Sequence, residues 1–118
     1  MSRIYKVFCV YLGNDLFSVF DSLTTQRGDK SRVVAMLINE FLEGKYSVYE
    51  LLDFEDRFTS NQRRNHSFLD KKTVHFNGDK EMLAKFADKC KRYGVSNWII
   101  LRALILEFVK PYLVTVSP

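Results

Sequence analysis

The spacing of hydrophobic residues in the last third of the chain predicts a strand followed by helices. Between residues 71 and 77 polar and apolar residues alternate, so Thr73, His75 and Asn77 fall on one face of a short strand. Val74 and Phe76 fall on the other face. We therefore expect an amphipathic strand here.

Two helices are expected after this strand. The Gly-Asp pair at 78–79 predicts a turn and an N-cap, and apolar residues then recur at helical spacing from Met82 to Cys90 until Gly94 ends the helix. Ser96 is the expected N-cap of a second helix, residues 97–110, that is apolar almost all the way round and that Pro111 is expected to end. Such a helix needs packing partners on several sides.

The first 44 residues follow the same order of patterns. Residues 4–12 predict a strand, and Asn14 or Asp15 is the expected cap of a helix whose apolar stripe runs from Leu16 to Leu23. Residues 30–42 predict a second helix closed by Gly44. An Arg-Gly-Asp turn at 27–29 separates the two helices. The chain is therefore interpreted as an internal repeat of strand, helix and helix.

This repeat predicts the fold class and the domain organisation. We expect a mainly α protein with short β-strands, made of two tandem units at 1–44 and 71–112 and a tail at 113–118. The connector at 45–70 is expected to hold one or two helical turns and then a polar, basic loop. A lone strand cannot satisfy its own edges, so the strands should pair into an antiparallel two-stranded ribbon, within one chain or between chains.

Charge is distributed unevenly along the chain. The 118 residues carry a formal net charge of +4, but residues 71–118 alone hold nine lysines and arginines against four acids. A local positive field favours a polyanionic partner such as nucleic acid, although a solubilising lysine surface gives the same composition.

The stretch 71–110 resembles the ribbon-helix-helix transcriptional repressors, which include Arc-type repressors and the methionine repressor. The resemblance is carried by Lys-Lys-Thr-Val-His-Phe-Asn as the ribbon strand and by Tyr-Gly-Val-Ser-Asn-Trp as the turn before the second helix. Residues 3–44 fit more loosely. Two copies in one chain are similar to tandem regulators encoded by archaeal filamentous viruses.

The resemblance implies a double-stranded DNA-binding regulator of transcription, with a ribbon that reads bases in the major groove and second helices whose N-termini hold phosphates. By position, the expected base contacts are Thr73, His75 and Asn77. The expected phosphate contacts are Lys71, Lys72, Ser96, Asn97, Lys30 and Arg32. As alternative interpretations, Asn77 can be a turn residue and Ser96 only a cap.

Two features of the first half and the connector leave alternatives open. Residues 5–12 are apolar on both faces, so either the Cys9 and Tyr11 face or the opposite face could be outward, or both could be buried. Asp29 would repel a phosphate at the start of the second helix, an effect that Lys30 and Arg32 could offset. Arg63 and Arg64 could reach a flanking phosphate or simply be solvated.

Other functional classes are less well supported by the sequence. No nucleophile with a positioned base, no phosphate-binding glycine loop and no zinc spacing is present, so we expect no enzyme, no cofactor and no metal. The alternative is a protein-binding module, either antitoxin-like or blocking a host factor, that uses its apolar helices and acidic connector. We expect an intracellular protein, in the host cytoplasm if viral, with no membrane association, and the apolar surface of 98–109 predicts a homodimer or higher oligomer.

Overall fold

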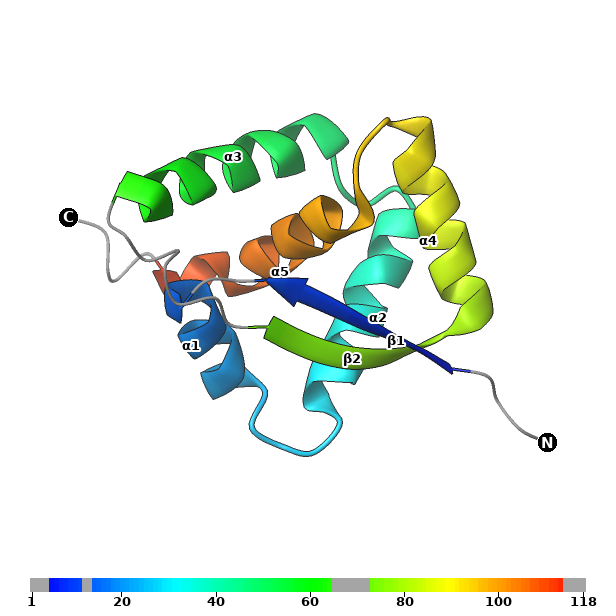
Figure 1. Cartoon of the computed structure of the whole chain (residues 1–118), viewed down its shortest axis with the longest axis horizontal. Helices are drawn as coiled ribbons and strands as arrows, with labels where there is room; N and C mark the ends of the chain where they lie inside the picture. The colour runs from blue at the N-terminus through cyan, green and yellow to red at the C-terminus, as the bar shows by residue number, and fades with distance from the viewer. Residues whose placement is uncertain (1–4, 12–13, 65–72, 114–118) are drawn as a thin grey trace.

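The computed structural model describes residues 5–11, 14–64 and 73–113. Along the chain the elements are β1 (Tyr5–Tyr11), α1 (Asn14–Leu23), α2 (Asp29–Leu42), α3 (Val48–Arg64), β2 (Thr73–Asp79), α4 (Lys80–Arg92) and α5 (Asn97–Leu113). The expected strand and helices of the first half are confirmed within one or two residues at each end. Figure 1 shows the helices gathered behind and around the β1–β2 pair.

Helix α5 lies at the centre of the molecule. It contacts β1 and all four other helices, and its residues Ile100, Leu101, Ala103–Leu106 and Val109 are fully or almost fully buried. This is the outcome expected for a helix that is apolar on all sides, because only burial removes every face from water. Most of the surface of 98–109 on which the homodimer prediction rested is therefore inside the protein; the exceptions are the exposed Trp98 and the partly exposed Ile99, Glu107 and Phe108.

The two halves of the sequence share one hydrophobic core. The ring of Phe41 in α2 packs edge-on against Phe86 in α4, with 5.6 Å between ring centres. In the same way Phe20 in α1 meets Phe108 in α5 at 6.2 Å. Both pairs join one half of the chain to the other, so neither half encloses a core of its own.

The predicted fold class of two tandem ribbon-helix-helix units is wrong. The described residues form a mostly helical body of five helices with one strand pair, and this pair is shared by both halves. The physical reason is the burial of α5, which needs α1, α2, α3 and α4 together. A separate two-helix unit would leave most of that helix exposed to water.

The connector contributes more structure than its composition predicts. In place of one or two turns it forms the 17-residue helix α3, which packs on α5 through Val48 and Leu51. The part expected to be a polar loop is helical up to Arg64. Apolar residues at 48, 51, 52, 54 and 58 supply the buried side that stabilises this helix, even though its remaining residues are polar.

Two element borders also differ from expectation. Residues 78–79 belong to β2 and not to a turn, and Asp79 is the N-cap residue of α4 without a capping hydrogen bond from its side chain. Pro111 lies inside α5, which continues to Leu113. A proline in the last turn removes one hydrogen bond, the one to the carbonyl oxygen four residues earlier, and the helix extends two residues beyond it.

Candidate nucleic-acid interface

The ribbon is formed within one chain by antiparallel pairing of β1 with β2. The register is continuous, with Tyr5 opposite Asp79, Cys9 opposite His75 and Tyr11 opposite Thr73. Of the two pairing modes left open by the sequence, the described structure has the intramolecular one. In Figure 1 the ribbon crosses in front of α2 and α5, both of which it contacts.

Gly78 identifies which face of the ribbon meets the helices. A Cβ atom added at Gly78 would lie only 2.9–3.1 Å from side-chain atoms of Leu83, a core residue of α4. Residues two apart in a strand share a face, and directly paired residues share it too. Positions 74 and 76 of β2 therefore lie on the helix-facing side with positions 6, 8 and 10 of β1.

The opposite face of the ribbon holds the positions expected to read bases. Thr73, His75 and Asn77 occupy this face, and their cross-strand partners are Tyr11, Cys9 and Val7. For β1 the register thus selects the face that contains Cys9 and Tyr11 as the outward one. The structure brings the three predicted base-contact positions together with β1 on one ribbon face, which is the geometry that fits a major groove.

The N-terminus of α5 is open to solvent. The carbonyl oxygen of Ser96 accepts hydrogen bonds from the amides of Ile99 and Ile100, which makes Ser96 the N-cap residue by its backbone. Ser96 is exposed and Asn97 is partly buried. Both predicted phosphate contacts therefore lie at an accessible helix start, where amide groups and the helix dipole favour an anion.

The N-terminus of α2 is arranged differently, because its charges are paired within the chain. The carboxylate of Asp29 accepts a hydrogen bond from the Gln26 amide at 2.9 Å and pairs with Arg32. Lys30 Nζ lies 2.7 Å from the carboxylate of Asp21 and 3.2 Å from the carbonyl oxygen of Thr24. The predicted phosphate contacts Lys30 and Arg32 thus serve to hold the α1–α2 loop.

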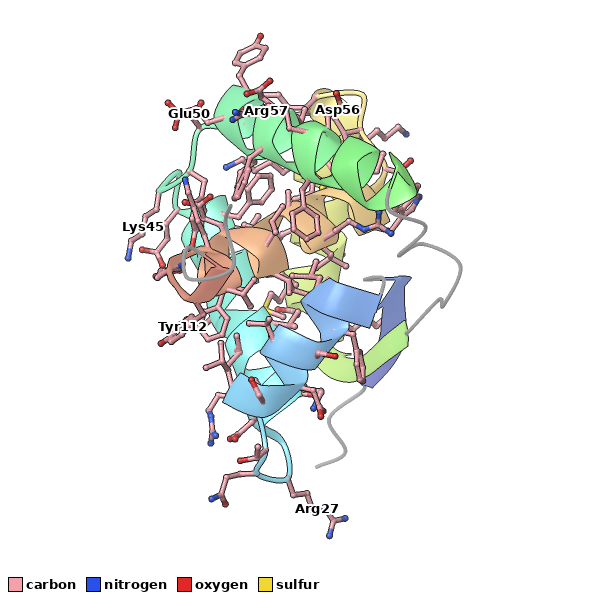
Figure 2. All side chains as sticks on the ribbon, turned by 90° about the vertical axis from the view of Figure 1, so that its left-hand side faces the viewer. Arg27, Lys45, Glu50, Asp56, Arg57 and Tyr112 are labelled. Atoms are coloured by element: carbon pink, nitrogen blue, oxygen red, sulfur yellow. The ribbon has the colours of Figure 1, made fainter. Side chains whose placement is uncertain are left out.

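Arg27 is a cation in this region that sequence reasoning did not select. It lies at the exposed tip of the α1–α2 loop in Figure 2, beside Gly28, whose φ of 85° is favourable for glycine. The signal was present in the sequence, because an arginine before a Gly-Asp turn is seldom buried. What the sequence lacked was the pairing that occupies Lys30 and Arg32.

The remaining predicted contacts are described only in part. Lys71 and Lys72 lie outside the described residues. Arg63 and Arg64 form the end of α3, and the structure describes only their backbone. Of the lysines in α4, Lys80, Lys85 and Lys91 are exposed, whereas Lys89 is turned to the α2 C-terminus.

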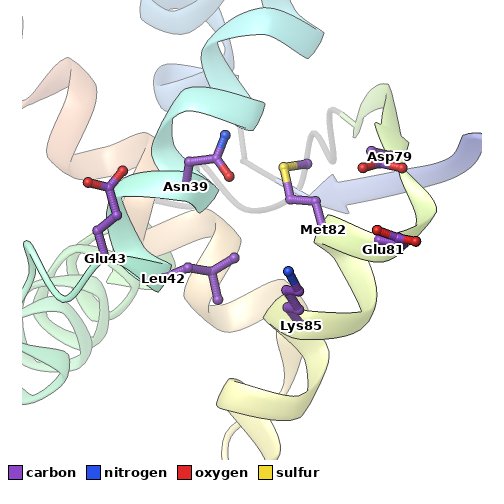
Figure 3. A pocket seen from close by; sticks show the side chains of 7 residues that line it. All are labelled: Asn39, Leu42, Glu43, Asp79, Glu81, Met82 and Lys85. Carbon is purple, nitrogen blue, oxygen red and sulfur yellow. The ribbon is translucent and has the colours of Figure 1, made fainter.

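A shallow cleft of about 470 Å³ separates the end of α2 from the start of α4 (Figure 3). No pattern in the sequence predicts this cleft. Its lining consists of Asn39, Leu42, Glu43, Asp79, Glu81, Met82 and Lys85. Three carboxylates against one ammonium group give the cleft a negative field, which is unfavourable for a phosphate.

Among the residues that the structure describes, no cluster of three or more His, Cys, Asp or Glu side chains could hold a metal ion. Nor does any described helix have the length and apolar character needed to cross a membrane. Comparison with family models, curated proteins and solved structures finds no match for this chain.

Proposed function

We propose that the chain is a sequence-specific double-stranded DNA-binding regulator of transcription that inserts the β1–β2 ribbon into the major groove. The observation that carries this proposal is the register of the ribbon, which puts positions 73, 75 and 77 on the face turned away from Leu83 and the helices. A two-stranded ribbon has the width of the B-DNA major groove.

The residue types on that face suit base recognition. Asn can make a bidentate contact with adenine, Thr offers a hydroxyl and a methyl group, and His can donate or accept a hydrogen bond. Position 77 is paired with Val7 and position 73 with Tyr11, so β1 brings an apolar and an aromatic residue to the same face. Apolar contact with thymine methyl groups is one use for such residues.

In this proposal the starts of α5 and α2 do not contact phosphate in the same way. The start of α5, with Ser96 and Asn97, offers backbone amides at an exposed helix N-terminus. At the start of α2 the buried Asp29 carboxylate occupies that place, Arg32 is exposed but paired with Asp29, and Arg27 is an exposed cation at the loop tip. Lys71 and Lys72 directly precede β2 in the sequence, and we propose that they contact the phosphate backbone of the DNA next to the ribbon.

The test is a binding titration of the full chain against random duplexes and duplexes enriched by selection, at two salt concentrations. The proposal expects a selected motif that binds more tightly than random DNA, with affinity that falls steeply as salt increases because bound counterions are released. Equal or absent binding to both pools at low salt would reject sequence-specific recognition.

A protein-binding function is the second candidate, and the exposed acidic side of α3 favours it. Glu50, Asp53 and Asp56 are exposed on this helix, while the apolar helix α5 is not available to a partner. Binding of a protein partner through α3 would not require the ribbon to bind DNA. Absence of DNA binding together with capture of a specific protein through α3 would favour this candidate.

A further inference from the structure

The two strands of the ribbon differ in residue type on the outward face. On the helix-facing side, two of the three pairs join identical residue types, Phe8 with Phe76 and Val10 with Val74. On the outward face the middle pair joins Cys9 to His75, and the pairs on either side of it also join unlike residues. The side of the ribbon that packs on the helices is therefore close to two-fold symmetric, whereas the proposed base-reading face is not.

The two ends of the outward face carry different chemical groups. At the end that leads into α4, Asn77 is paired with Val7. At the end that leads into α1, Thr73 is paired with Tyr11. One end thus combines an amide with an aliphatic side chain, and the other combines a hydroxyl with a phenol. After a two-fold rotation the ribbon would present different groups to the same bases.

The helix starts on the two sides of the ribbon differ as well. In Figure 1 α2 begins below the ribbon and α5 begins above it. The first turn of α5 contains no acidic residue, whereas that of α2 contains Asp29, which is buried and accepts a hydrogen bond from the Gln26 amide. Two phosphate backbones border a major groove, so one would meet the open start of α5 and the other the exposed Arg27.

One chain holds all of these different surfaces in a fixed arrangement. The ribbon pairs within the chain, and α5 is covered by helices from both halves. The contacts of Phe41 with Phe86 and of Phe20 with Phe108 join the halves in one core. A single chain therefore completes the ribbon and both of its flanks without a second copy.

We propose that one chain binds one short, non-palindromic duplex site in a single orientation, which rests on the DNA-binding function proposed above and defines its substrate. A two-fold symmetric protein matches a palindromic site, because each half-site meets the same residues. This ribbon offers each half of a site different residues. Positions 73 to 77 span about 13 Å of strand, which corresponds to base reading over about four to six base pairs.

The residues at the α4 end of the ribbon indicate the base pair that this end prefers. In the major groove an A·T pair presents N6 and N7 of adenine next to the methyl group of thymine. Asn77 suits the adenine edge, and Val7, its cross-strand partner, suits the methyl group. We therefore expect an A·T pair at this end of the site, without a symmetry-related A·T contact at the other end.

The first experiment selects tight-binding duplexes from a random pool with the full chain and then measures stoichiometry on the enriched sequence. The expected motif lacks two-fold symmetry and saturates at one chain per duplex. A palindromic motif that binds two chains would overturn this inference and leave the DNA-binding function standing. Absence of any enriched motif at low salt would reject the DNA-binding function together with the inference.

The second experiment locates the two ends of the ribbon on the enriched site. Asn77→Ala should reduce discrimination about tenfold at base pairs of one end only, and Thr73→Ala at base pairs of the other end only, as measured with single-base variants of the site. In a symmetric complex each substitution would act at both ends. Loss at both ends from either variant would therefore contradict the single orientation.

A third measurement tests the contact assigned to Val7. Replacing thymine by uracil in the expected A·T pair removes one methyl group and should weaken binding of the wild type about fourfold, the equivalent of one buried methyl group. Val7→Ala should bind both duplexes equally. A full fourfold loss that persists in Val7→Ala would show that another residue contacts this methyl group and would remove Val7 from the A·T contact.

Phosphate ethylation interference tests the two flanks separately. Arg27→Ala should abolish interference on one flank of the site and leave the other flank unchanged, because the start of α5 binds through backbone amides. Lys45→Ala is the matched control, since Lys45 is exposed on the side of the molecule away from the ribbon (Figure 2) and should change neither flank. Equal weakening of both flanks by Arg27→Ala would overturn the single orientation.

Discussion

The ammonium group of Lys89 in α4 donates a hydrogen bond to the carbonyl oxygen of Phe41 in α2, with 2.5 Å between the two atoms. The same ammonium group lies 4.5 Å from the centre of the Phe41 ring. A positive charge thus meets the negative end of the α2 dipole and the face of an aromatic ring at once. This contact joins the two sequence halves at the edge of their common core.

Replacing Lys89 with Met keeps the aliphatic stem and removes the charge. We expect the free energy of unfolding to fall by about 1–3 kcal/mol, the range for a hydrogen bond to a charged group with a cation–π contact. Urea denaturation measures the change. The exposed Lys85 on the same helix is the control, because Lys85→Met should alter stability by no more than about 0.5 kcal/mol. Equal effects of the two substitutions would contradict the role given to Lys89.

The buried pair of Arg102 and Glu55 holds α3 on α5. Arg102→Met should destabilise the protein by about 3–5 kcal/mol, because it removes the cation that lies 3.7 Å from the buried carboxylate of Glu55. Adding Glu55→Met should recover a large part of this loss, since an apolar pair of similar volume no longer buries a charge. Thermal or urea unfolding of the single and double variants gives the comparison. A double variant less stable than Arg102→Met would show that the loss comes from packing and not from the charge.

Gly78 has no room for a side chain. Gly78→Ala places a methyl group within 2.9–3.1 Å of side-chain atoms of Leu83, so either the Leu83 side chain or the ribbon must shift. We expect a loss of about 1–3 kcal/mol in the free energy of unfolding, the usual range for overpacking. In a chain that already carries Leu83→Val, which shortens the contacting side chain, Gly78→Ala should lower the free energy of unfolding by less than it does in the wild type. Additive costs would mean that Gly78 and Leu83 do not interact in this way.

Burial of the Cys90 thiol gives the stability a pH dependence. Burial raises the pKa of Cys90 from about 9 to about 11, while the nearby Lys89 acts in the opposite direction. The folded state therefore favours the neutral thiol. The stabilisation that comes from keeping this thiol neutral is fully present below pH 9. It is lost as the pH rises towards 11, which lowers the free energy of unfolding by up to about 3 kcal/mol for a shift of two pKa units. The stability difference between wild type and Cys90→Val should change over this interval, and a constant difference from pH 8 to 11 would oppose the assignment.

Under the proposed DNA-binding function, substitutions at Asn77 and at Lys72 should affect DNA binding in different ways. Asn77→Ala should cost about 1–3 kcal/mol at one base position and relax specificity there, because a base-edge contact is lost. Lys72→Ala should weaken specific and random duplexes alike and reduce the salt dependence, as expected for a phosphate contact. Competition binding with single-base operator variants distinguishes the two. Equal losses for Asn77→Ala on specific and random DNA would remove it from the base-contact set.

The sequence pattern determined most of the local structure. Alternation at 71–77 identified a strand, and helical spacing identified α1, α2, α4 and α5 near their observed ends, because these periodicities follow from which side of an element is buried. The face of β2 that carries Thr73, His75 and Asn77 also followed from alternation. For β1 alternation was uninformative, since both faces are apolar, and pairing with β2 selected the outer face.

Only the tertiary structure decided how the elements are assembled. The sequence repeat suggested two units, but burial of α5 on all sides requires helices from both halves and from α3, which merges them into one body. The pairing of Lys30 with Asp21 is likewise set by how α1 and α2 are arranged, whereas Arg32 pairs with Asp29 at i,i+3 spacing within α2. Together the two pairings engage two cations that the sequence offered to phosphate. Local periodicity records which residues avoid water, whereas the identity of the partner that covers them depends on contacts between distant parts of the chain.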